Sequence, residues 1–157
     1  MTDKADIEIH FLSRPQYLCM IRGAIEALSR RLGMDEESAN RVVLAVDEAI
    51  TNVIRHGYEN ADDRPIQLKI TQTTRFGREG LWFVIEDESK TDPAVIKPKP
   101  EQNTEPGGMG VRIIIEAMDE VQYALRKDGQ GLQLTMFKAI EPITETTNAT
   151  TTRETQP

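Results

Sequence analysis

Cysteine is almost absent from this 157-residue chain, since Cys19 is the only one. A single cysteine cannot form a disulfide within the chain, and nothing near Cys19 has the spacing of a metal or redox site. We therefore expect a reducing, cytoplasmic compartment. A free cysteine usually behaves as a small apolar residue, so we expect Cys19 to lie in the core.

Long apolar runs and an excess of basic residues are also lacking. No apolar stretch approaches the roughly 18 residues that cross a bilayer, and the first stretch, "MTDKADIEIHFLSRP", lacks the apolar segment of a signal peptide. Lys and Arg number 19 against 26 Asp and Glu, which gives a net charge of −7. Binding to a nucleic-acid backbone would require clustered positive charge. We therefore expect neither a membrane nor a nucleic-acid partner.

The length of the chain fits one domain with a single hydrophobic core. The final stretch, "ITETTNATTTRETQP", is rich in threonine and has almost no large apolar side chain. Such a segment cannot bury enough surface to offset the entropy lost on ordering. We expect one folded domain over residues 1–140 and a disordered tail over residues 141–157.

Hydrophobic periodicity predicts an α+β protein. Alternating patterns predict strands at residues 7–11, 66–74, 81–87, 120–127 and 132–139. Helical patterns predict three helices, the first from a capping box at Ser13 and Gln16 to about Leu32, the second after an N-cap at Asp35, and the third over residues 109–119. The expected fold is a two-layer α/β sandwich, with a mixed, mostly antiparallel sheet and helices on one face. Residues 88–108 lack periodicity and are expected to form a lid or a disordered insert.

The predicted second helix carries the stretch "LAVDEAITNVIRHG", in which Glu48 and Asn52 lie one turn apart. Its apolar stripe is expected to face the sheet, with Arg41, Ala45, Glu48 and Asn52 on the opposite side. The small residues near Glu48, such as Ala45 and Ala49, would leave room for a ligand. Glu48 could accept a proton, and the amide oxygen of Asn52 could bind Mg²⁺. The alternative is that both side chains simply face water.

Two further motifs could bind a nucleotide. Asp87 closes the strand "VIED" and could accept a hydrogen bond from an exocyclic amine, although aspartate is also common in turns. The stretch "PGGMGVRIII" places Gly107, Gly108 and Gly110 at the start of a helix, where backbone N–H groups can approach a phosphate. A flexible turn is the alternative there.

In order and separation, "DEAITNVIRHG", Asp87 and "GGMGVRIIIEAMDEV" resemble the GHKL nucleotide-binding superfamily. Within it, the short length and the "GGMG…MDEV" stretch resemble most closely the anti-sigma factor serine/threonine-protein kinases of bacterial partner-switching systems. The resemblance covers about residues 5–140. It implies a Bergerat-type ATP-binding fold and a kinase that uses ATP and Mg²⁺.

The resemblance also implies a role for each matching position. Glu48 would be the general base, Asn52 would hold Mg²⁺ on the ATP phosphates, and Asp87 would bind the adenine amino group. The remaining nucleotide-binding positions would be Gly108, Met109, Gly110, Val111 and Arg112. The implied partners are a sigma factor and a STAS-type anti-sigma factor antagonist, with a homodimer formed through the sheet as a possibility.

Three features depart from the family pattern. Ser89 stands where the family usually has glycine two residues after the aspartate, and its Cβ disfavours positive φ, so the loop is expected to sit differently or to bind nucleotide weakly. Asp92 and Pro93 match the family, but Thr91 replaces its phenylalanine. Pro106 precedes the glycines where some members have a basic residue, which leaves Lys97, Lys99 and Arg112 as candidates to neutralise the terminal phosphate.

A second function therefore stays open, a partner-switching binding module with the same fold and weak or absent catalysis. A sensor histidine kinase fits less well, because the sequence shows no helical hairpin with a phosphoacceptor histidine. A chaperone or topoisomerase ATPase also fits less well, because it would need a transducer domain in addition to the single domain expected in these 157 residues.

Overall fold

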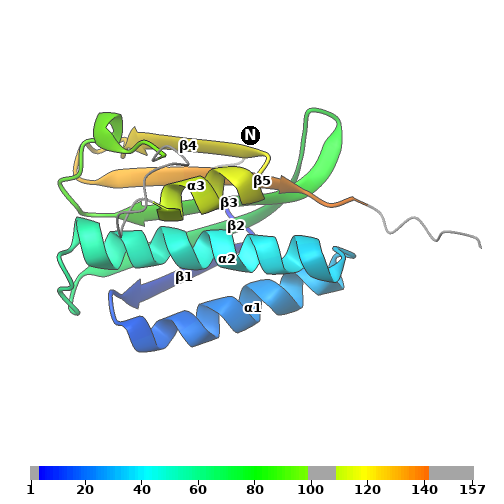
Figure 1. The fold of residues 1–157 in the computed structure, drawn as a ribbon, viewed down its shortest axis with the longest axis horizontal. Helices are drawn as coiled ribbons and strands as arrows, with labels where there is room; N and C mark the ends of the chain where they lie inside the picture. The colour runs from blue at the N-terminus through cyan, green and yellow to red at the C-terminus, as the bar shows by residue number, and fades with distance from the viewer. Residues whose placement is uncertain (1–3, 99–108, 142–157) are drawn as a thin grey trace, which may run out of the picture.

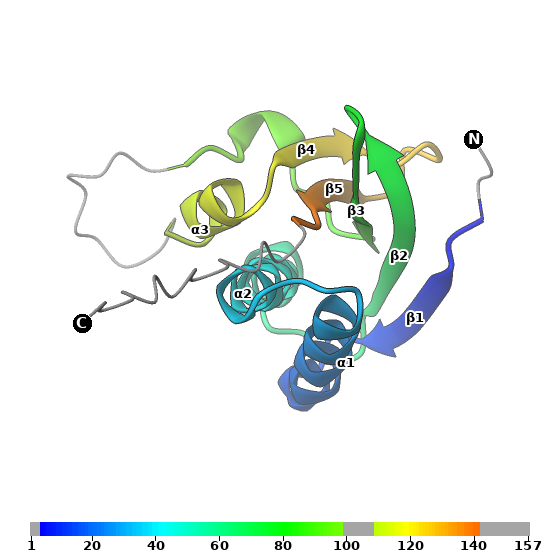
Figure 2. The same ribbon diagram turned by 90° about the vertical axis from the view of Figure 1, so that its right-hand side faces the viewer.

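The computed structural model describes residues 4–98 and 109–141. Its sheet has five strands in the order β1-β2-β3-β5-β4, and every neighbouring pair is antiparallel. Helices α1, α2 and α3 lie together on one face of this sheet (Figures 1 and 2). The expected two-layer α+β sandwich is confirmed.

The chain forms these elements in the order predicted from periodicity. The strands are β1 (Ile7–Leu12), β2 (Pro65–Arg75), β3 (Arg78–Asp87), β4 (Glu120–Leu125) and β5 (Leu132–Ala139). The helices are α1 (Leu18–Arg31), α2 (Glu36–Asn52) and α3 (Met109–Ala117). Short turns of helix are η1 (Pro15–Tyr17), a π-helical turn η2 (Val53–Gly57) and η3 (Pro93–Val95).

Local sequence signals account for two of these boundaries. The carboxylate of Asp35 accepts a hydrogen bond from the backbone N–H of Ser38 at 2.7 Å, which confirms the predicted N-cap of α2. Strands β2 and β3 are joined by Phe76 and Gly77, with φ of 52° and 73°. Positive φ at both central residues is typical of a type I′ turn, whose twist matches the paired strands.

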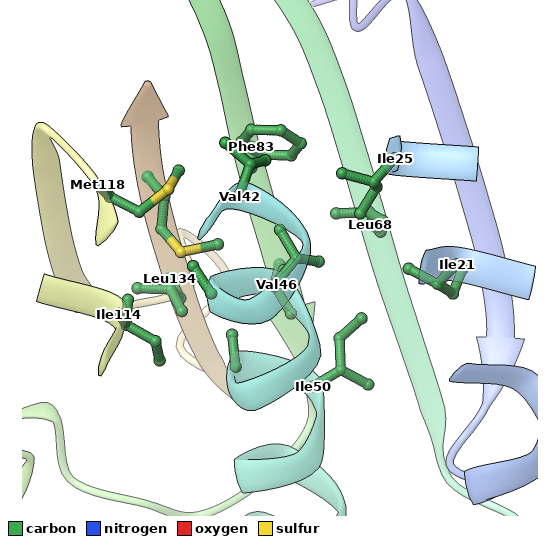
Figure 3. Close-up of a cluster of buried hydrophobic side chains, with 14 of the residues drawn as sticks. Ile21, Ile25, Val42, Val46, Ile50, Leu68, Phe83, Ile114, Met118 and Leu134 are labelled. Carbon is green, nitrogen blue, oxygen red and sulfur yellow. The ribbon is translucent and has the colours of Figure 1, made fainter. Parts of the chain in front are cut away.

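The core lies between the helices and the sheet (Figure 3). Val42, Val46 and Ile50 of α2 are all fully buried in this layer. Phe83 of β3 faces α2 from the sheet side, and Ile114 of α3 closes the core laterally. Burying a side chain of this kind contributes about 1.5–3 kcal/mol, so α2 is fixed against the sheet along most of its length.

One assignment on α2 is wrong. Ala45 and Ala49, expected on the open side of the helix, are 0% and 2% exposed. They are buried because α3 packs beside α2 (Figure 2). The small side chains allow the two helices to approach each other, and Ala49 also lines a cavity that is lined by Asp87 as well.

Two predictions near the N-terminus are also wrong. Cys19 is exposed rather than buried, because the buried stripe of α1 consists of Leu18, Ile21, Ile25 and Ser29. The hydroxyl of Ser13 does not cap a helix. It donates to the carbonyl of Ala61 at 2.6 Å and thereby ties the end of β1 to the segment before β2.

Part of the predicted lid, residues 88–98, is described and contains η3. The rest of the lid, including Gly107 and Gly108, lies outside the described residues, as does nearly all of the predicted tail. Across residues 4–98 and 109–141, no helix is long and apolar enough to cross a membrane.

Candidate functional site

A cavity of about 260 Å³ lies where the end of α2, the end of β3 and the segment from Thr91 to Lys97 meet. Most of its lining is apolar, as in many small-molecule sites. The residues with polar groups that line it are Asn52, His56, Asp87, Ser89, Thr91, Lys97 and Tyr123. A few polar groups in an apolar wall can orient a ligand that is largely aromatic.

Asp87 is 2% exposed and lines this cavity. Its Oδ1 accepts hydrogen bonds from the backbone N–H groups of Ser89, at 2.7 Å, and Leu132, at 3.4 Å. The backbone amides thus fix the carboxylate through Oδ1, and Oδ2 is the oxygen that can meet a ligand. A buried carboxylate held in this way is suited to accepting a hydrogen bond from an amine.

Glycine at position 131 allows β5 to approach Asp87. A Cβ built on Gly131 would lie 1.9 Å from the backbone oxygen of Asp87, and the φ of Gly131 is +146°. A larger residue would therefore be excluded by contact as well as by conformation. On the same oxygen, Nη1 of Arg126 donates a hydrogen bond at 3.3 Å.

Tyr58 connects three segments around the site. Its hydroxyl donates to the carbonyl of Pro65 at 2.5 Å and accepts from the backbone N–H of Glu88 at 2.6 Å. Burial raises the pKa of Tyr58 to about 12, while the hydrogen bond from Glu88 acts in the opposite direction. The protonated hydroxyl therefore links the end of α2, the start of β2 and the residue after Asp87.

The π-helical turn η2 brings the end of α2 to the cavity. The backbone N–H of Tyr58 donates to the carbonyl of Val53 at 2.8 Å, five residues earlier. Within this turn, Val53, His56 and Gly57 line the cavity. Such turns occur frequently at functional sites, where they redirect the end of a helix.

Glu48 and Asn52 meet the first turn of α3. A Cβ built on Gly110 would lie 2.7 Å from Oε2 of Glu48 and 3.1 and 3.2 Å from Nδ2 and Oδ1 of Asn52. Both side chains are half-buried between the two helices. The structure therefore brings Glu48, Asn52 and Gly110 together, and Asn52 also lines the cavity of Asp87.

The other predicted residues of this segment lie at different distances from the cavity. Val111 lines it, whereas the side chain of Met109 is 66% exposed. Nε of Arg112 pairs with Oε1 of Glu116 at 2.6 Å, one turn along α3. Lys97 lines the cavity, and Gly108 and Lys99 lie outside the described residues.

Ser89 avoids positive φ, as its side chain favours. Among the described non-glycine residues, positive φ occurs only at Glu59, Asn60 and Phe76. The side chain of Ser89 is buried and lines the cavity beside Asp87.

Tyr58, Leu132 and Gly131 were not identified from the sequence. Nothing in the pattern around Tyr58 distinguishes it from an ordinary apolar residue after a helix. Gly131 belongs to the stretch "DGQG" between the last two predicted strands, and nothing in that stretch indicates a contact with Asp87.

The donor groups present fit ATP and a hard cation. Within the described part of the chain, no three His, Cys, Asp or Glu side chains form a metal cluster. The amide oxygen of Asn52 and the neighbouring carboxylate of Glu48 are ligands of the type that Mg²⁺ accepts when phosphate oxygens supply the rest. The apolar cavity with a buried carboxylate fits a purine bearing an amine.

A known protein family matches most of the chain. Residues 11–138 match the family described as the histidine kinase-like ATPase domain. An anti-sigma F factor from Clostridium kluyveri is 31% identical over 144 residues, which cover 87% of this chain and 96% of that protein. The serine-protein kinase RsbW of Halalkalibacterium halodurans is 23% identical over 138 residues, covering 86% and 83%.

A solved structure shares the fold. It contains the RsbU and RsbW domains of a Mycobacterium tuberculosis protein and aligns with a TM-score of 0.55 at 14% identity. The alignment covers 85% of this chain but only 32% of that longer chain. From the matching domain and these relatives, the chain belongs to the histidine kinase-like ATPase (GHKL) family, in the group of the RsbW and anti-sigma F proteins.

Proposed function

We propose that this protein is an ATP- and Mg²⁺-dependent serine/threonine-protein kinase that binds a sigma factor and phosphorylates a STAS-type anti-sigma factor antagonist. The names of its relatives, serine-protein kinase and anti-sigma F factor, support this activity. The observation that carries the proposal is the meeting of Glu48, Asn52 and Gly110 beside the cavity that holds Asp87.

Each of these residues has a distinct task. The free oxygen of Asp87 accepts a hydrogen bond from the adenine amino group, and the apolar walls exclude water from the ring. Asn52 would hold the metal through its amide oxygen, and the bound metal would supply positive charge against the phosphates. Gly110 lies at the start of α3, where backbone N–H groups and the helix dipole favour negative charge. The resemblance assigns Gly108, which lies outside the described residues, to the same phosphate contact.

Glu48 accepts the proton of the attacking serine or threonine hydroxyl. Its carboxylate lies next to Asn52, so it is adjacent to the end of the nucleotide that carries the phosphates. A general base in this position typically contributes about 10²–10⁴ to the rate. Met109, Val111 and Arg112 complete the nucleotide contacts from α3.

One observation favours the second candidate, a binding module with weak turnover. Arg112, one of the three candidates to neutralise the terminal phosphate, is paired with Glu116. In that arrangement the positive charge is shared with a neighbouring carboxylate. If Arg112 rather than Lys97 or Lys99 neutralises the terminal phosphate, it must change partner when a nucleotide binds.

Phosphate transfer by a Glu48→Gln variant tests the kinase proposal. The assay follows transfer from γ-labelled ATP to purified STAS-type antagonists of the same organism, with Glu37→Gln on the exposed start of α2 as the matched control. Glu48→Gln is expected to lower transfer by about 10²-fold or more, with ATP affinity nearly unchanged and the control fully active. Transfer at the wild-type rate by Glu48→Gln would rule out Glu48 as the base.

The partners are tested by association rather than turnover. We expect a purified sigma factor and the unphosphorylated antagonist to bind competitively. We also expect a cytoplasmic location and, as a further prediction, a homodimer formed through the sheet, which light scattering would detect.

A further inference from the structure

Ser89 carries a buried hydroxyl that has no partner. The residue is 6% exposed, and its Oγ makes no hydrogen bond within the described residues. Leaving such a group unsatisfied costs about 1–3 kcal/mol. A hydroxyl in this state, in the wall of a cavity, points to a ligand that completes its hydrogen bonding.

The position of Ser89 is fixed by its neighbours. Its backbone N–H donates to Oδ1 of Asp87 at 2.7 Å, which places the hydroxyl and the carboxylate on the same short turn. On the other side, a Cβ built on Gly57 would lie 3.0 Å from Cβ and 3.3 Å from Oγ of Ser89. The absence of a side chain at Gly57 therefore makes room for the serine against the cavity.

We infer that the Ser89 hydroxyl donates a hydrogen bond to the ring nitrogen of adenine that adjoins the amino group. This inference rests on the proposed function, in which Asp87 accepts from that amino group. A carboxylate beside a hydroxyl presents an acceptor next to a donor. The adenine edge presents the matching pair, an amino donor next to the N1 acceptor.

The Ser89 hydroxyl thus adds a polar contact to adenine at the position where the family usually has glycine. Under this inference Ser89 raises nucleotide affinity, whereas weaker binding was one of the two outcomes expected from the sequence. A serine that only filled space would treat all purines of the same shape alike. Nucleotide analogues can therefore separate the two roles.

The test measures binding by calorimetry with ATP and with 1-deaza-ATP, in which a C–H replaces N1. The proteins are the wild type, Ser89→Ala, Ser89→Gly and a control, Ser29→Ala. Ser29 is also fully buried with an unpartnered Oγ, but it lies on α1 and does not line the cavity. The control therefore removes the same chemical group away from the site.

Both Ser89 variants are expected to bind ATP about three- to tenfold more weakly than the wild type, as for a lost neutral hydrogen bond. The wild type is expected to show a similar loss for 1-deaza-ATP, and the Ser89 variants are expected to show little further loss with that analogue. Ser29→Ala should bind both nucleotides as the wild type does.

Other outcomes would overturn the inference. Unchanged ATP affinity in Ser89→Ala, equal losses for both nucleotides, or tighter binding by Ser89→Gly would each show that the hydroxyl does not contact N1. If Asp87→Asn abolishes binding while Ser89→Ala does not change it, this inference fails and the proposed function stands. If the wild type binds no nucleotide, the proposed function fails and the inference fails with it.

Discussion

Replacing Gly110 by alanine should change the stability of the fold very little but should lower the rate of phosphate transfer. The new methyl group would lie 2.7 Å from Oε2 of Glu48, closer than two such atoms can approach, and 3.1–3.2 Å from the amide of Asn52. The carboxylate is the far end of a flexible side chain, so it can move away at small cost to the fold. It would then leave the position from which it accepts the substrate proton.

The two effects have different magnitudes. Alanine favours a helix interior over glycine by about 0.8–1.0 kcal/mol, and less near a helix end, so the free energy of unfolding should change by about 1 kcal/mol or less. A displacement of about 1 Å at a catalytic group can lower the rate about 10²-fold. We therefore expect Gly110→Ala to fold normally and to transfer phosphate about 10²-fold more slowly.

Gly23→Ala is the matched control. Gly23 lies inside α1, and a Cβ built on it would meet nothing within 4 Å. It should therefore raise the free energy of unfolding, by about 0.5–1 kcal/mol, and leave transfer unchanged. Urea unfolding and transfer from labelled ATP to an antagonist measure both quantities. Wild-type transfer by Gly110→Ala would refute the argument that contact with α3 fixes a catalytic Glu48.

Two other predictions concern stability. The Ser13→Ala variant loses a hydroxyl that donates to Ala61 and accepts from the N–H of Arg64 at 3.1 Å, so urea unfolding should show a loss of about 1–3 kcal/mol; a loss below experimental error would contradict this. Because the folded pKa of Tyr58 is raised from 10.0 to about 12, its contribution is complete below pH 10 and is lost as the pH rises to 12. Tyr58→Phe should therefore show a smaller fall in stability over that range, and an equal fall would count against the role of its hydroxyl.

Much of the fold could be predicted from short-range patterns. Period-two alternation located all five strands of the described sheet, because the alternation of side chains along a strand is a local property of the chain. The N-cap of α2 at Asp35 was also predicted from local sequence. These signals depend on a few neighbouring residues and on no distant contact.

Helix faces were less predictable. The sequence of α2 shows which side is apolar, but alanine is neutral enough to lie on either side. Ala45 and Ala49 are buried by α3, which begins 60 or more residues further along the chain. Cys19 is similar, because its exposure depends on the part of α1 that the sheet covers. Such choices follow from long-range packing.

The candidate site likewise contains residues that local motifs identify and residues that only long-range contacts identify. Glu48, Asn52 and Asp87 could be named from motifs, and the structure brings Asn52 and Asp87 to one cavity with Glu48 adjacent. The supporting residue Tyr58 could not be named, because its hydrogen bonds join segments that are separated in sequence. The sequence identified Ser89 as unusual, but its burial and its unpartnered hydroxyl required the structure.

Nucleotide binding is the central claim and can be measured directly. Calorimetric titration with ATP, with and without Mg²⁺, would compare the wild type with Asp87→Asn. Asparagine retains Oδ1, which accepts from Ser89 and Leu132, and replaces the ligand-facing oxygen by an amide N–H₂ group. Asp35→Asn is the matched control, because asparagine caps a helix as well as aspartate does.

The account predicts Mg²⁺-dependent ATP binding by the wild type and by Asp35→Asn, with affinity about tenfold or more weaker in Asp87→Asn, as for a lost hydrogen bond to a charged group. Absence of ATP binding by the wild type, or equal affinity in Asp87→Asn, would contradict it.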